Sequence, residues 1–198
     1  KGDDDSTGGL GCFARTSSWF YIFAMIFAFG TLIGLACCGN AAKKFPTNYI
    51  LLSVFTVAEG VMVGTICLYY SAEVVWLALL MTCLVTLGLT LFACQTKYDF
   101  TGMGGYLFAG LMALTVFGFV LMVFGSVNGA AMSTTYKVYA GIGVVIFSLY
   151  IVYDTQLIIG SPDASKPHKY AFGIDDYAFA AANLYLDVIN LFMMILMV

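Results

Sequence analysis

Three carboxylates interrupt otherwise apolar stretches of this 198-residue sequence: Glu59, Asp154 and Asp187. An acid at the centre of a transmembrane helix costs about 2.5–3.5 kcal/mol on insertion scales. A residue of this kind either stays protonated and hydrogen-bonds helices together, or it binds and passes protons and cations. Both interpretations stay open for each of the three acids.

The last apolar segment carries a polar stripe. Asn183, Asp187 and Asn190 are spaced i, i+4 and i+7, which places them on one face of a helix. That face must point into the protein, because lipid would leave these groups without hydrogen bonds. Tyr150 and Asp154 share a face of the preceding segment in the same way, so the phenol can reach the carboxylate.

Antiparallel neighbours joined by one loop can bring Asp154 and Asp187 together. Two carboxylates about 4 Å apart repel by about 4 kcal/mol at an effective dielectric near 20. One proton would therefore be shared, and its loss near neutral pH would strain the interface. The pair predicts a pH-responsive latch in which a cation could replace the proton.

Oxygen-rich side chains of this kind suit calcium, which prefers oxygen ligands. We expect calcium as a transported or bound ion and no other cofactor, with Asp154 and Asp187 as the candidate metal ligands. The predicted pH sensor and ion pathway consists of Asp154, Asp187, Glu59, Asn183, Asn190 and Tyr150.

The composition identifies the surroundings of these residues. Hydrophobic residues make up 62% of the chain and charged residues only 10%, against about 45–50% and about 25% in soluble domains. A body of this size cannot hide so much apolar surface, so a lipid bilayer must cover it. The eight Lys and Arg residues are scattered, which excludes a nucleic-acid partner. The expected partners are lipid, and calcium or protons.

About 20 apolar residues are needed to cross a bilayer as a helix. Six segments qualify, joined by links short enough to make neighbours antiparallel. The sequence therefore predicts an all-α polytopic membrane bundle of six transmembrane helices, with a polar leader at 1–17 and a single domain at 18–198. The predicted spans are 18–38, 47–70, 74–95, 104–127, 136–160 and 177–198.

Basic residues in the loops indicate the orientation, because Lys and Arg collect on the cytoplasmic side. Five lie on one face and three on the other, which places the first face in the cytoplasm. Both chain ends then lie on the opposite side, so we expect a further helix upstream. The first face has Lys43, Lys44, Lys97, Lys166 and Lys169, and the second has Lys1, Arg15 and Lys137.

Four stretches resemble the transmembrane Bax inhibitor motif family. SLYIVYDTQLIIG at 148–160 and DYAFAAANLYLDVINLF at 176–192 are similar to its closing signature, whereas FPTNYILL at 45–52 and QTKYDFT at 95–101 are similar to its Lifeguard branch. The resemblance implies seven helices with the last one central, and a pH-sensitive calcium leak linked to protection from cell death. It also implies that Asp154 and Asp187 are the pH sensor.

That resemblance favours the endoplasmic reticulum, the Golgi or the plasma membrane, with the inner mitochondrial membrane as an alternative. The chain departs from the family in two ways. It lacks the first family helix, and Lys43 and Lys44 stand where bacterial relatives have a latching arginine. Either lysine could serve as the latch cation, although its point charge lacks the bidentate fork of arginine.

Two other functions compete with the ion pathway. An intramembrane aspartyl protease also uses two membrane aspartates, but its second motif needs glycines where Leu184, Tyr185 and Leu186 precede Asp187. We therefore predict that the protein is not an enzyme. The other alternative is a non-catalytic accessory or structural subunit of a larger membrane complex, in which the ion site is silent.

Overall fold

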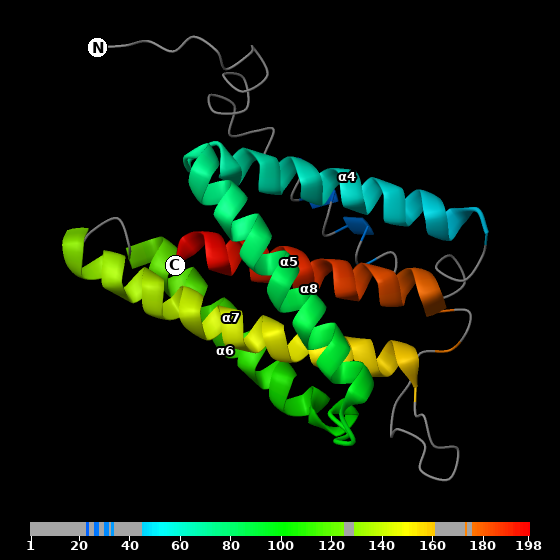
Figure 1. The fold of residues 1–198 in the computed structure, drawn as a ribbon. Helices are drawn as coiled ribbons and strands as arrows, with labels where there is room; N and C mark the ends of the chain where they lie inside the picture. The colour runs from blue at the N-terminus through cyan, green and yellow to red at the C-terminus, as the bar shows by residue number, and fades with distance from the viewer. Residues whose placement is uncertain are drawn as a thin grey trace. The chain divides into compact units, whose positions relative to one another are not determined.

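The computed structural model describes residues 45–124, 129–160 and 176–198, together with residues 23, 26, 27, 30, 31, 33 and 173. All regular structure in this part of the chain is helical (Figure 1). The chain divides into two compact units, which are described separately. The first unit is Lys1–Val75 with Asp175–Ala182, and the second is Trp76–Ile174 with Asn183–Val198.

Five of the described helices are long and apolar enough to cross a membrane, which makes the chain an integral membrane protein. Pro46 directly precedes the first of them, and Gly160, at φ +71°, ends the fourth. A short 3₁₀ turn, Thr101–Met103, precedes the third. The helices are α4 (Thr47–Cys67), α5 (Ala72–Gln95), α6 (Gly104–Phe124), α7 (Gly129–Ile159) and α8 (Tyr177–Met197).

These five helices correspond to the last five of the six predicted spans. The largest difference is the start of α7, at Gly129 rather than Tyr136. Most of the intervening residues are small or polar, so their hydropathy is weak, yet they continue the helix. With 31 residues α7 is about 46 Å long, more than the bilayer core of about 30 Å.

Some predictions fall outside the described residues. They include the leader at 1–17 and most of the first span at 18–38, of which only single positions are described, as helix. The total of six helices, the seven of the family and the central place of the last helix therefore stay predictions. So does the single domain.

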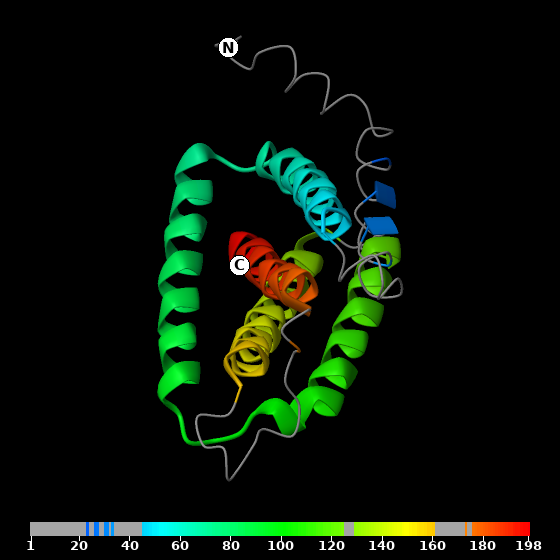
Figure 2. The ribbon, with the colours of Figure 1, turned by 90° about the vertical axis from the view of Figure 1, so that its right-hand side faces the viewer.

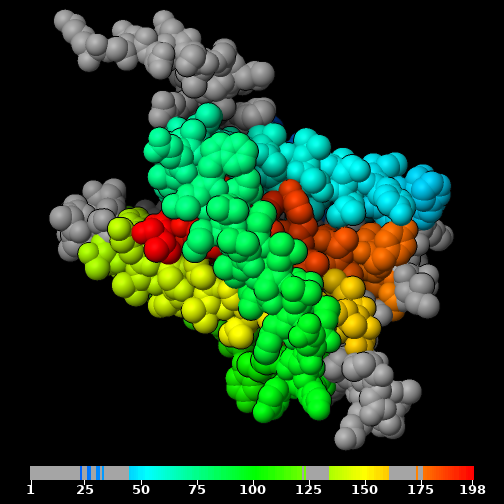
Figure 3. Space-filling model, viewed as in Figure 1, coloured from blue at the N-terminus to red at the C-terminus, as the bar shows by residue number. Residues whose placement is uncertain are grey.

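Apolar side chains on the outer face of α5 show how the protein meets lipid. Helix α5 is drawn in space-filling form in Figure 3. Five of its large residues, spaced to form one stripe along the helix, are each more than half exposed: Trp76, Leu80, Leu84, Leu87 and Leu91. Such a stripe would be unfavourable in water and is stable against hydrocarbon. The high hydropathy of α5 as a whole, rather than an amphipathic pattern, therefore identifies it as a membrane-spanning helix.

The core of the second unit joins α6, α7 and α8. Its buried residues are Leu114 from α6, Phe147 and Ile151 from α7, and Leu191 and Met194 from α8. Helices α6 and α7 lie side by side, and α7 and the second-unit part of α8 run in opposite directions (Figures 1 and 2).

This core sets the level of the two aspartates. Asp154 follows Ile151 by one turn of α7, and Asp187 precedes Leu191 by one turn of α8. In antiparallel helices these steps lead to the same end of the packed pair, so the cluster to which Ile151 and Leu191 both belong aligns the two acids in depth.

Candidate functional site

Asp154 and Asp187 are both buried, with 5% and 7% of their surfaces exposed. Their carboxyl groups are hydrogen-bonded to each other across α7 and α8. An ionised carboxylate only accepts hydrogen bonds, so a bond between two carboxyl groups requires a proton on one of them. The two carboxyl groups therefore lie where one proton could bridge them.

Polar groups of α7 surround this pair unevenly. Tyr150 is half-buried and close enough to interact electrostatically with both carboxyl groups, and its ring lies edge-on to that of Tyr153 with the centroids 6.3 Å apart. Thr155 Oγ1 and Asp187 Oδ2 are buried without a hydrogen-bond partner in the described part of the chain. The pair therefore has one phenol nearby and unused acceptor capacity at Asp187 Oδ2.

The two asparagines of the α8 stripe are half-buried. Asn190 donates from Nδ2 to the carbonyl of Leu186 at 2.8 Å, which satisfies part of its amide within its own helix. Neither Asn183 nor Asn190 has a hydrogen bond to the aspartates among the described residues. Both lie on the helix that carries Asp187, and their part in the ion pathway stays a prediction.

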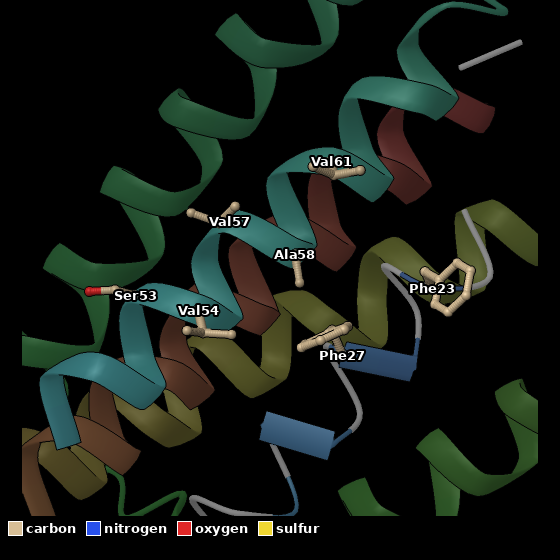
Figure 4. Close-up of a pocket in the computed structure, with 7 residues that line it drawn as sticks. All are labelled: Phe23, Phe27, Ser53, Val54, Val57, Ala58 and Val61. Carbon is tan, nitrogen blue, oxygen red and sulfur yellow. The ribbon is translucent and has the colours of Figure 1, made fainter. Parts of the chain in front are cut away.

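Glu59 belongs to the first unit, where it is 9% exposed on α4. The candidate latch residues Lys43 and Lys44 lie outside the described residues, so their position stays a prediction. An open, apolar cavity of about 420 Å³ also lies in this unit (Figure 4). Its lining has no carboxylate, so the cavity suits hydrocarbon rather than an ion: Phe23, Phe27, Ser53, Val54, Val57, Ala58 and Val61.

The described residues offer few side chains that could act together as metal ligands. They contain no group of three or more His, Cys, Asp or Glu side chains that could hold a metal ion. Because calcium takes six to eight oxygen ligands, the two aspartates would have to be joined by backbone, hydroxyl or water oxygens. The calcium site at Asp154 and Asp187 stays a prediction.

Sequence reasoning gave no role to Gln156, which lies two residues after Asp154. Its Oε1 accepts a hydrogen bond from the N–H of Phe100 at 2.8 Å, and its Nε2 donates to the carbonyl of Tyr98 at 2.9 Å. The only signal in the sequence is an uncharged amide near the end of an apolar helix. Its partners are backbone groups, which no side-chain pattern reveals.

These features define a class: a polytopic α-helical membrane protein with a buried, hydrogen-bonded pair of carboxyl groups on its last two helices. Residues 6–198 match the family described as "Inhibitor of apoptosis-promoting Bax1". The chain belongs to this Bax inhibitor family, which is linked to the regulation of apoptosis.

The similar proteins carry the Lifeguard name. Protein lifeguard 3 of Homo sapiens is 35% identical over 187 residues, covering 92% of this chain and 56% of the relative. Protein lifeguard 3 of Mus musculus is 34% identical over 94% of this chain and 58% of the relative. Protein LIFEGUARD 2 of Arabidopsis thaliana is 38% identical over 78% of this chain and 59% of the relative. The chain thus spans little more than half the length of these relatives.

Proposed function

We propose that the protein is a pH-sensitive cation leak channel, or a regulator of membrane calcium homeostasis, that acts in the control of cell death. The observation that supports this proposal is the hydrogen bond between Asp154 and Asp187, which joins α7 to α8 inside the apolar part of the protein. The proposed location is the endoplasmic reticulum, the Golgi or the plasma membrane.

The proposed mechanism follows from proton sharing. With one proton, the pair forms a hydrogen bond that holds α7 against α8. When the proton leaves, two like charges about 4 Å apart repel by about 4 kcal/mol at an effective dielectric near 20. The helices then separate at this level, or a cation takes the place of the proton. The interface therefore weakens as the pH rises, which couples helix packing to pH.

We propose no catalytic activity. The second motif of an intramembrane aspartyl protease needs glycines where Leu184, Tyr185 and Leu186 precede Asp187. A cation pathway needs only that the pair change its charge and its contacts.

The test is calcium flux in liposomes that contain the purified protein, measured at pH 6 and pH 8 against protein-free liposomes. The proposal expects a flux above the control that differs between the two pH values. Equal fluxes at both pH values would contradict pH gating, and no flux at either would contradict the leak. In the second case, copurification of other membrane subunits would favour an accessory role.

A further inference from the structure

The loop between α5 and α6, residues 96–103, is fastened to α7 by the buried side chain of Gln156. Its carboxamide accepts from the N–H of Phe100 and donates to the carbonyl of Tyr98, and only 2% of its surface is exposed. The two backbone groups flank Asp99. One side chain thus occupies a donor and an acceptor of the loop at the same time, which fixes the loop against α7.

The loop is also shaped from within. Asp99 Oδ1 accepts from the backbone N–H of Thr101 at 2.9 Å and from its hydroxyl at 2.5 Å, and Thr101 is completely buried. The ring of Phe100 meets that of Phe92 at the end of α5, with the centroids 6.1 Å apart. The segment QTKYDFT therefore forms a loop whose conformation is held by its own contacts as well as by Gln156.

A second contact lies beside this one. A Cβ atom at Gly104, the first residue of α6, would stand 2.6 Å from Tyr153 Oη. A larger residue at this position would have to displace the Tyr153 hydroxyl, so glycine leaves room for the approach of Tyr153 to the start of α6. Tyr153 and Gln156 share one face of α7 and lie on either side of Asp154 in the sequence. The turn of α7 that carries Asp154 is thus held by the loop and α6 as well as by Asp187.

We propose that Gln156 is a positioning residue for the aspartate pair, an inference that rests on the proposed function. By binding the loop, it holds the last turns of α7 at the level where Asp154 meets Asp187. Separation of the pair then requires α7 to move against this attachment. The pH at which the pair separates is set by the repulsion of the carboxylates and by the hydrogen bonds of Gln156 together.

The attachment itself does not titrate, because a carboxamide is uncharged at every pH of interest. Several other residues of α6, α7, α8 and the loop in the second unit are titratable or charged, and the one on α6 is an exposed tyrosine. These groups are Tyr150, Tyr153 and Asp154 on α7, Asp187 on α8, Lys97, Tyr98 and Asp99 in the loop, and Tyr106 on α6. The pH response therefore comes from the pair, and Gln156 sets its midpoint.

The first test is Gln156→Leu, which keeps the apolar volume and removes both hydrogen bonds. Calcium leak in liposomes is measured as a function of pH. The infrared band of the protonated carboxyl pair is measured over the same pH range, and the band is assigned because it should disappear in Asp187→Asn. We expect both midpoints to fall by about one pH unit, the order expected when hydrogen bonds of ordinary strength are lost. The matched control is Gln95→Leu, at an exposed position at the end of α5, which should leave both midpoints unchanged.

Gln156→Glu provides a second test that does not depend on the fold of the leucine variant. When protonated, the new acid can still accept from Phe100 and donate to Tyr98, so the variant should match the wild type at low pH. When ionised, it can no longer donate to the Tyr98 carbonyl. The transition should therefore become steeper and end at lower pH than in the wild type.

The outcomes separate the two proposals. A folded Gln156→Leu protein with the wild-type midpoint in both measurements would overturn the positioning role, even if the wild type leaks as proposed. If the wild type does not leak, the proposed function fails, and the infrared midpoint still decides the role of Gln156. A glutamate variant that matches the wild type at every pH would also contradict the role.

Discussion

Replacing either aspartate of the pair by asparagine should remove most of the pH dependence of the cation leak. The two carboxyl groups are hydrogen-bonded and buried, so two charges there would stand about 4 Å apart and repel by about 4 kcal/mol. One pH unit corresponds to about 1.4 kcal/mol, so this repulsion is equivalent to about three pH units. Asp154→Asn and Asp187→Asn each leave one ionisable group, and the repulsion disappears.

The stability of these variants should change in a defined direction. The folded wild type keeps a proton that the unfolded chain releases, so its stability should decrease as the pH rises through the transition. Asparagine preserves the shape and can donate from its amide to the remaining carboxyl group. Each single variant should therefore match the wild type at pH 6 and be more stable at pH 8, measured as thermal unfolding in detergent.

The assay is leak rate against pH for the wild type, both single variants and the double variant. Because both substitutions delete one shared interaction, their effects should be strongly non-additive. Unchanged pH profiles in both single variants would refute the sensor. Additive effects would show that the two acids act separately, although they are hydrogen-bonded in the structure.

Three further predictions concern residues outside the pair. Glu59→Gln should fold better than Glu59→Lys, because an amide keeps hydrogen bonds whereas a buried cation adds desolvation; better expression of the lysine variant would identify an ion pair instead. Gly143→Val should lower thermal stability by about 1–3 kcal/mol relative to Gly141→Val. A Cβ at Gly143 would lie 2.5 Å from a methionine sulfur of α8, whereas Gly141 faces open space. Equal losses of stability in the two variants would contradict this prediction. Tyr177→Phe removes the hydroxyl that accepts a hydrogen bond from the fully buried Asn48, and it should lower the free energy of unfolding by about 1–3 kcal/mol. Adding Asn48→Ala to this variant should cost little more. Additive losses would show that the two residues do not stabilise the protein through this one bond.

Hydropathy alone predicts the described helices well. The sequences of α4, α5, α6 and α8 exceed the length that a bilayer requires, and polar or turn residues mark their ends. The start of α7 was predicted seven residues late because residues 129–135, most of them small or polar, have a low mean hydropathy. Helix formation there depends on backbone hydrogen bonds, which hydropathy does not measure.

Spacing places Asp154 and Asp187 on inward faces, but it cannot fix their relative depth. That depth depends on how α7 and α8 slide along each other, and the buried cluster that contains Ile151 and Leu191 sets it. Gln156 is harder still to predict. Its partners are the backbone N–H of Phe100 and the carbonyl of Tyr98, and every residue type except proline offers both groups.

The contrast between acids and other polar residues explains why the proposed mechanism gives the pair a response to pH. Thr65, Thr82 and Asn190 donate to the carbonyl four residues earlier in their own helices, at 2.7–2.8 Å. Such hydroxyl and amide groups are satisfied locally and do not titrate. A carboxylate has no donor, and the interior N–H groups of its helix are already bonded, so it needs a proton or a cation from elsewhere.

Asp154 and Asp187 meet this need together, because one proton serves both acids. The bond that satisfies them disappears when that proton leaves, so their packing must change with pH or admit a cation. An asparagine at either position would provide the same bond without a proton that can leave. In the proposed mechanism, the choice of two acids, rather than an acid and an amide, is therefore the feature that would make this helix contact sensitive to pH.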